Sequence, residues 1–247
     1  NMDWDRLTAL VAWDEKALAP VLAIGAVTIG FIIYYFVMSS GKLEDKFLKR
    51  FGREDGQANW IIFSRFWGGF WLGAPSLLLP ILFLDQSPAD FGMSFGMTSE
   101  ALIITAVLCP ILIVMNIFRA GKPNNLQHYP QIRKREWTMF TFGGSSLGWI
   151  VYLLGYELCF RGFLLFGCAS VLGVWPAIAI NASIYSFAHF FKGIGETVGA
   201  IPFGIIVSVI SLFTGNFMVA FLVHCSLALS NQTVAFLAHP EMKWKRG

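Results

Sequence analysis

Charged residues are scarce in this sequence. Asp, Glu, Lys and Arg make up 13% of its 247 residues, whereas a soluble domain carries about 25%. Hydrophobic residues make up 56%, and the chain has 24 Phe and 9 Trp. Such a composition excludes an ordinary soluble domain and is typical of a chain that contacts lipid through many side chains. We therefore predict an integral membrane protein surrounded by membrane lipids.

A strong excess of charge of one sign is missing as well. The formal net charge is +3, and the basic residues lie in short segments between apolar runs. A nucleic-acid-binding surface concentrates basic residues on one face. We therefore predict no nucleic-acid partner, and we interpret the basic segments as signals that orient the chain in a membrane.

Cysteine is also rare, and its spacing matches neither a zinc site nor a disulfide framework. Free cysteine behaves as a small apolar residue. We therefore predict no structural metal site and four buried free thiols, all in apolar runs: Cys109, Cys159, Cys168 and Cys225.

Long uncharged runs, by contrast, recur along the whole chain. A helix needs about 20 apolar residues to cross a hydrocarbon core of about 30 Å. We predict seven spanning helices: about 17–38, 60–84, 101–118, a long helix between GGSS and VLGVWP, 176–190, 194–213 and 216–237. An eighth element that lies in the interface or re-enters the membrane is an open alternative. The predicted fold is an all-α polytopic transmembrane bundle, one domain over residues 1–247.

The segments between these helices alternate in charge. A predicted loop after the first helix and a second loop near residues 119–135 are basic, whereas the segment between them is acidic. The positive-inside rule then places the N-terminus outside and the C-terminus in the cytoplasm, with Lys192 also on the cytoplasmic side. We expect a prokaryotic plasma membrane.

Two further predictions concern residues at the membrane interface. The N-terminal segment lacks the basic start and cleavage site of a signal peptide. Its tryptophans, Trp4 and Trp13, indicate an interfacial amphipathic segment over residues 1–16. Arg65 lies near the start of the second helix, and we expect its guanidinium to reach the interface.

The stretch GYELCFRGFLLFG, residues 155–167, places two ionisable groups inside an apolar helix. Glu157 and Arg161 are four residues apart and therefore share one helical face. Ionisable groups inside a membrane are costly and usually mark a site that faces the interior of a bundle. If the chain turns near Gly173, Glu157 and His189 lie 16 residues on either side of the turn, about 24 Å from it. Because the two residues lie at equal depth, we predict that the Glu157 carboxylate and the His189 imidazole can face each other across this helical hairpin.

A third polar group, His224, lies in the apolar run of the last helix. A carboxylate and two histidines inside a bundle can bind a metal ion or activate a water molecule. They can equally satisfy one another as a structural network. The residues alone leave both interpretations open.

Three short motifs resemble those of the CAAX-protease and bacteriocin-processing family. YELCFRG resembles the EExxxR motif, YSFAH at residues 185–189 resembles FxxxH, and the last helix resembles the segment with HxxxN, starting at His224. The order and intervals match over about residues 144–231, which we take as the family-like core.

This resemblance implies a helical core of a glutamate-type intramembrane protease. In such proteins the first Glu and the FxxxH histidine polarise the attacking water, while the second Glu and the Arg support them. The final His and Asn help to stabilise the oxyanion, and no metal or other cofactor is required. By position, Glu157 is the second Glu, Arg161 the Arg, His189 the water-binding His and His224 the last-helix His.

Two positions depart from the pattern. Tyr156 stands where the first Glu belongs, and Ala228 stands where the Asn belongs. A phenol, with a reference pKa of about 10, is a poor base at neutral pH, and the loss of one oxyanion donor costs about a hundredfold or more in rate. Both changes predict impaired peptide hydrolysis.

Three functional hypotheses follow. In the first, the chain has lost the family's chemistry and binds or scaffolds other membrane proteins. In the second, it is an active, metal-independent intramembrane endopeptidase that cleaves peptides or prenylated or pro-peptide substrates, with Glu157 as the base beside His189. In the third, His189 or His224 is an axial ligand of a metal, haem or chlorophyll-type cofactor.

Overall fold

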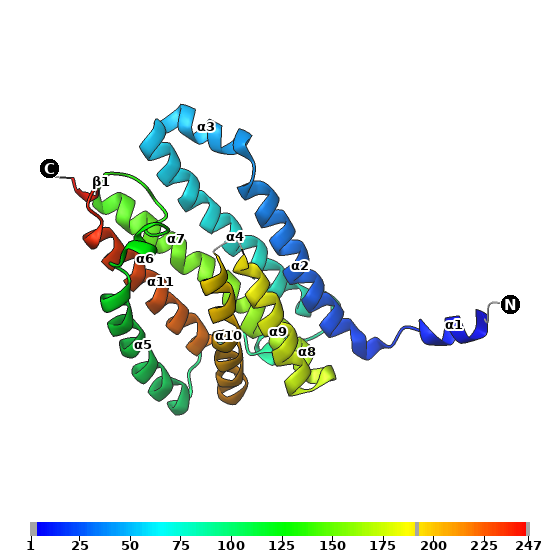
Figure 1. Cartoon of the computed structure of the whole chain (residues 1–247). Helices are drawn as coiled ribbons and strands as arrows, with labels where there is room; N and C mark the ends of the chain where they lie inside the picture. Colours follow the sequence, from blue (N-terminus) through cyan, green and yellow to red (C-terminus); the bar gives the residue numbers. More distant parts are fainter. Residues whose placement is uncertain (1–3, 191–192, 246–247) are drawn as a thin grey trace.

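The fold is a bundle of helices with a short pair of strands at one end (Figure 1). It comes from a computed structural model that describes residues 4–190 and 193–245. The α-helices are α1 (Trp4–Leu10), α2 (Leu18–Met38), α3 (Gly41–Phe51), α4 (Arg53–Phe83), α5 (Ser99–Arg119), α6 (Pro123–Leu126), α7 (Met139–Glu157), α8 (Leu165–Leu172), α9 (Val174–Ala188), α10 (Ile194–Thr214) and α11 (Met218–Ala238). A π-helical segment (Leu158–Leu164) joins α7 to α8, and 3-10 turns lie at Glu15–Ala17 and Pro88–Phe91. β1 (Glu136–Trp137) pairs in parallel with β2 (Lys243–Trp244).

The predicted all-α transmembrane bundle is confirmed. Within the described residues, six helical stretches are long and apolar enough to cross a membrane: Glu15–Met38, Arg53–Phe83, Ser99–Arg119, Met139–Leu172, Ile194–Thr214 and Met218–Ala238. The predicted helix at 176–190 corresponds to α9, which has 15 residues. At 1.5 Å per residue it is about 22 Å long, too short to cross a hydrocarbon core alone.

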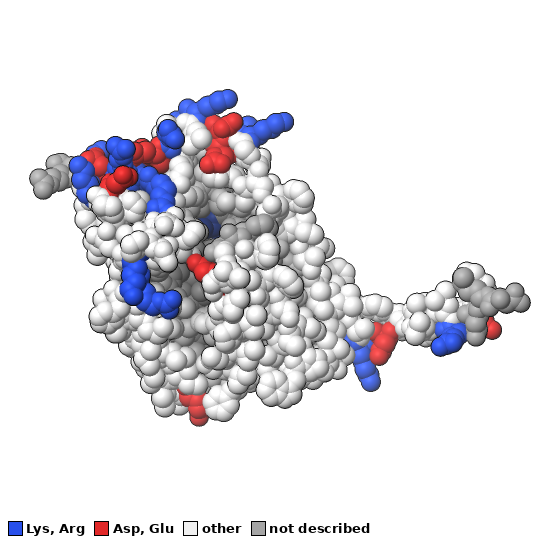
Figure 2. Space-filling view, viewed as in Figure 1, with Lys and Arg blue, Asp and Glu red and all other residues white. Residues whose placement is uncertain are grey.

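Charged side chains gather over one end of the molecule, around α3, β1 and the C-terminal end of the chain (Figure 2). Much of the rest of the face shown is uncharged. An uncharged surface beside a charged end is typical of a bundle that spans a membrane and exposes its charged end to water. The orientation in the membrane, the type of membrane and the interfacial position of residues 1–16 stay predictions. Lys192 lies outside the described residues.

The loop predicted after the first helix is wrong, because these residues form α3. Ser40 caps its start through the Leu43 amide at 3.4 Å, and Gly52, with φ of 79°, ends it. The Phe47 ring packs on Trp60 with ring centroids 5.5 Å apart. The mixed charges lie on the outer faces of an amphipathic helix, which explains why they looked like a loop.

The expectation that Arg65 reaches the interface is also wrong. Its side chain lies inside the bundle, with the residue 4% exposed. The guanidinium donates to the Ser145 carbonyl and hydroxyl, each at 2.8 Å, and to Gln131 Oε1 at 3.0 Å. It also lies 4.0 Å from the ring centroid of Trp149. Protein acceptors on α7 and in the segment that precedes it thus replace the water that a surface arginine would use.

Glycines allow α4 and α7 to approach closely. A Cβ added at Gly69 would lie 2.5 Å from the Val151 carbonyl oxygen, and one added at Gly73 would lie 2.9 Å from the Gly155 Cα. A Cβ at Gly155 would collide with the Gly69 carbonyl oxygen. This contact fixes the end of α7 on which Tyr156 and Glu157 stand.

We therefore predict that Gly155→Ala lowers the free energy of unfolding in detergent by about 1–3 kcal/mol, the usual cost of overpacking. Thermal unfolding of the purified protein measures this. The matched control is Gly143→Ala on the same helix, where an added Cβ meets nothing within 4 Å. A loss of stability at Gly143 as large as that at Gly155 would contradict the close α4–α7 contact.

Candidate functional site

The site begins where α7 changes into a π-helix. Tyr156 and Glu157 are the last two residues of α7, and Arg161 lies in the π-helical segment. Every residue of Leu158–Leu164 is buried. π-helical turns are uncommon and often occur at functional sites. This π-helical segment could not be predicted, because its apolar residues suit an α-helix equally well.

Asn181 of α9 holds this segment in place. Its side-chain amide donates to the Phe160 carbonyl at 2.6 Å, and its Oδ1 accepts from the Ser208 hydroxyl of α10 at 3.2 Å. Asn181 is fully buried. The Phe160 carbonyl also accepts from the Leu165 N–H, so Asn181 adds a second, side-chain donor to it. The sequence analysis missed this residue.

Glu157 is bound to two partners inside the bundle. Its Oε1 accepts a hydrogen bond from His224 Nδ1 at 2.7 Å, and Arg161 Nη1 lies 3.2 Å from Oε2. The Glu157 and Arg161 side chains are at most 1% exposed. A buried charge is tolerated only when it is paired and hydrogen-bonded. The three residues therefore tie α7, the π-helical segment and α11 together.

His189 lies at the C-terminal end of α9. The predicted turn is present at Gly173, between α8 and α9. His189 Nδ1 donates to the Tyr185 carbonyl at 2.9 Å. The Tyr185 ring lies 4.6 Å from the His189 ring and 6.3 Å from the His224 ring, centroid to centroid. Tyr185 thus connects the two histidines, and the hydrogen-bond partner of Glu157 is His224.

The tautomers of both histidines follow from these bonds. A carboxylate and a carbonyl can only accept, so Nδ1 carries the proton in each ring. Both rings reach the cavity described next.

A cavity of about 350 Å³ lies beside this network. His189, His224 and Ala228 line it, so these predicted positions come together at one surface. Its other lining residues are Asn116, Arg119, Asn125, Tyr129, Trp149, Tyr185, Glu196, Gly199, Ala200, Phe203, Leu227 and Asn231. Glu157, with 0% exposure, lies behind the cavity wall.

Tyr156 is packed as a core aromatic residue. Its ring stacks on Phe160 with centroids 4.4 Å apart and meets the His224 ring edge-on at 5.8 Å. It is 3% exposed, and its hydroxyl has no hydrogen-bond partner among the described residues. The Arg161 Nε and Nη2 groups also have none within the described chain. A phenol in this position supplies no anionic group to the histidines.

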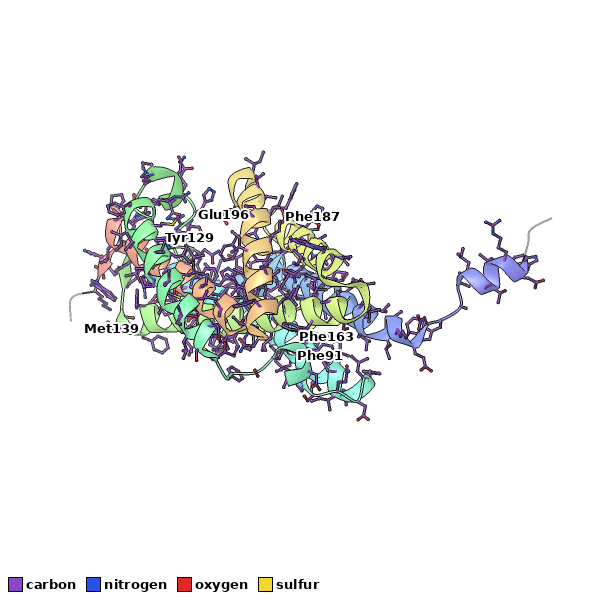
Figure 3. All side chains as sticks on the ribbon, turned by 90° about the horizontal axis from the view of Figure 1, so that it is seen from below. Phe91, Tyr129, Met139, Phe163, Phe187 and Glu196 are labelled. Atoms are coloured by element: carbon purple, nitrogen blue, oxygen red, sulfur yellow. The ribbon has the colours of Figure 1, made fainter. Side chains whose placement is uncertain are left out.

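The carboxylate that does line the cavity is Glu196, which the sequence analysis missed. Thr197 donates its hydroxyl to the His189 carbonyl at 3.1 Å, which brings the start of α10 beside that histidine. Tyr129 donates its phenol to Glu196 Oε1 at 3.4 Å, and Figure 3 labels both residues. Burial raises the pKa of Tyr129, and the Glu196 carboxylate raises it further, so the phenol stays a donor. No local motif could have indicated Glu196, because only the fold brings it to the cavity.

Among residues 4–190 and 193–245, no group of three or more His, Cys, Asp or Glu is arranged to hold a metal ion. All four cysteines are free, and all except the half-buried Cys109 are buried. The polar groups that line the cavity are imidazoles, amides, phenols, a carboxylate and a guanidinium.

The buried ion pair predicts a large effect of Glu157→Gln on stability. The amide leaves the Arg161 charge buried without a counter-charge, which typically costs about 3–5 kcal/mol of unfolding free energy. Adding Arg161→Met should recover part of this loss, because the unpaired charge is then gone. Unfolding in mixed detergent measures both variants.

Glu136→Gln is the matched control, since Glu136 pairs with Lys243 at 3.2 Å with side chains 47% and 71% exposed. A surface pair of this kind is worth about 1 kcal/mol or less. Equal losses from Glu157→Gln and Glu136→Gln would show that the buried pair does not stabilise the bundle.

A family model described as type II CAAX prenyl endopeptidase Rce1-like matches residues 139–230. The matched range runs from the start of α7 into α11 and contains Tyr156, Glu157, Arg161, His189 and His224. No curated protein and no solved structure matches the chain.

Proposed function

We propose that the chain binds a peptide segment but is impaired in the hydrolysis typical of type II CAAX prenyl endopeptidases, whose Rce1-like family model matches residues 139–230. The bound segment belongs to another membrane protein, and the chain acts on it as a binding or scaffold subunit.

One observation carries the proposal: the Glu157 carboxylate is wholly buried and already bound to Arg161 and His224. A general base must come within about 3 Å of the water or proton on which it acts. Because Glu157 is fully buried and does not line the cavity, its position favours a structural role over that of the base in the second hypothesis.

The cavity itself is retained. Its amides, histidines, Tyr129 and Glu196 offer donors and acceptors suited to a peptide backbone. Its volume of about 350 Å³ falls in the range of ligand pockets, roughly 300–1,000 Å³. Loss of the base with retention of the pocket favours binding without turnover.

A second candidate function is supported by the position of Glu196. This carboxylate lines the same cavity as His189 and His224, and a carboxylate beside an imidazole can activate water. In that case the chain would be an endopeptidase whose base comes from α10 instead of α7.

We predict that the purified wild-type protein leaves a farnesylated CAAX-type peptide intact at neutral pH, as followed by mass spectrometry. Tyr156→Glu with Ala228→Asn should produce measurable cleavage, because it restores both lost groups. The unpartnered Arg161 N–H groups can neutralise the new carboxylate. Tyr156→Gln with Ala228→Asn is the control that has no base and should stay inactive.

Cleavage by the wild-type protein would contradict the first proposal. If Glu196→Gln then abolished that cleavage and left peptide binding intact, the second candidate would replace it. Peptide binding and thermal unfolding of each variant distinguish a loss of chemistry from a loss of fold.

A further inference from the structure

A groove at the charged end of the molecule lies between α4 and the start of α7. Its volume is about 380 Å³, and Phe51 of α3, Ile62 of α4 and Phe140 of α7 form part of its wall. It shares no lining residue with the cavity beside the two histidines. The groove is therefore a separate feature from the site described above.

The groove changes from polar to apolar along α4. The α4 residues that line it run from Asp55 to Ile62, a distance of about 10 Å at 1.5 Å per residue. Phe51 and Phe140 beside them are 44% and 82% exposed. Both α4 and α7 belong to helical stretches that are long and apolar enough to cross a membrane. The groove thus leads from the charged end toward the part of the bundle that the hydrocarbon core surrounds.

Positive charge prevails at the polar end of this groove. Lys134, with a side chain 14% exposed, pairs with Asp55, the acidic residue that lines the groove. The Lys245 side chain also lines the groove and has no ion pair within the described chain. The Arg50 guanidinium lies 5.2 Å from the ring centroid of Phe51, which places a further cation beside the groove.

The backbone that carries these cations is held by its neighbours. A Cβ added at Gly56 would lie 2.6 Å from the Leu48 Cα, so α3 packs closely against the start of α4. On the other side of the groove, the Lys245 N–H donates to the Trp137 carbonyl at 2.9 Å. The adjoining hollow, which Lys245 also borders, is lined by equal numbers of acidic and basic residues. It therefore does not cancel the positive charge of the groove.

An anionic phospholipid matches both ends of the groove. Its phosphate group accepts charge-assisted hydrogen bonds from lysine and arginine, and basic residues close to a membrane surface attract anionic lipids. An acyl chain of the same molecule can lie along Ile62 and Phe140. A soluble phosphate would leave this apolar part unused, and a zwitterionic headgroup would bring a positive charge to a positive site.

We propose that this groove binds one anionic phospholipid, with the phosphate group at Arg50 and Lys245 and an acyl chain against Ile62 and Phe140. The bound lipid joins α3, α4, α7 and the residue after β2 at the charged end of the bundle. The proposal does not depend on peptide binding in the cavity beside the histidines.

The test uses the full chain in neutral detergent, titrated with phosphatidylglycerol or with phosphatidylcholine of identical acyl chains. Native mass spectrometry counts the bound lipid. Two cations that each contribute about fivefold predict that the wild type binds the first phosphatidylglycerol about 25-fold more tightly than the first phosphatidylcholine. Arg50→Gln and Lys245→Gln should each reduce this preference about fivefold, and the double variant should remove it.

Lys42→Gln is the matched control for charge. Lys42 is an exposed basic residue in the first turn of α3, about 12 Å from Arg50 along the helix, and it does not line the groove. Its replacement should leave the preference unchanged. A loss from Lys42→Gln as large as that from Arg50→Gln would show diffuse attraction to the whole basic face of α3, and the defined site would be wrong.

Phe140→Ala tests the apolar part of the groove. It should weaken both lipids about equally, because the ring faces the acyl chain, and it should leave the preference intact. Met139→Ala is its control, since Met139 is 75% exposed and does not line the groove; both affinities should stay unchanged. Equal binding of the two lipids by the wild type, or no effect of Phe140→Ala, would contradict the proposal. So would a dimer that Phe140→Ala dissociates, because a second copy of the chain would then occupy the groove.

Discussion

The interaction between Glu157, Arg161 and His224 is the constraint on which the rest of the bundle depends. A carboxylate with 0% exposure is tolerated only if its charge is balanced and it accepts hydrogen bonds, as Glu157 Oε1 does from Arg161 and His224. Arg161 supplies the charge from the adjoining π-helical segment, and His224 supplies a donor from α11. The register of α11 against α7 is thereby fixed, and the histidine ring is aimed at the cavity.

The buried Glu157–Arg161 pair is separate from the surface of the cavity. Tyr156 fills the core beside the network and stacks on Phe160, while both histidines and Glu196 line the cavity. The Glu157 and Arg161 charges pair with each other in the core.

Much of the fold followed from the sequence. Runs of apolar residues set the long helices, and Gly173, with φ of 86°, ends α8 where a residue with a side chain would be strained. The resemblance to known motifs placed His189, His224 and Ala228 correctly at one surface, although it could not give their partners. Spacing alone gave matching depths for Glu157 and His189, but the direction of each side chain depends on how α9 and α11 rotate against α7.

The features that could not be predicted depend on contacts distant in sequence. Arg65 looked like an interfacial residue, and only the fold brings Ser145 and Gln131 to its guanidinium. The π-helical turn depends on Asn181, and the cavity depends on Glu196 and Arg119, which come from different helices. None of these residues carries a local signal that distinguishes it from an ordinary polar residue in a helix or at its end.

The central claim is that Glu157 acts as a structural partner of His224 inside the bundle. A double-mutant cycle on unfolding free energies tests it most directly, with Glu157→Gln combined in turn with His224→Ala and with His189→Ala. The account predicts a coupling on the order of 1–3 kcal/mol between Glu157 and His224, and a coupling close to zero between Glu157 and His189. A strong coupling to His189 together with none to His224 would contradict it, because the carboxylate would then act at the cavity.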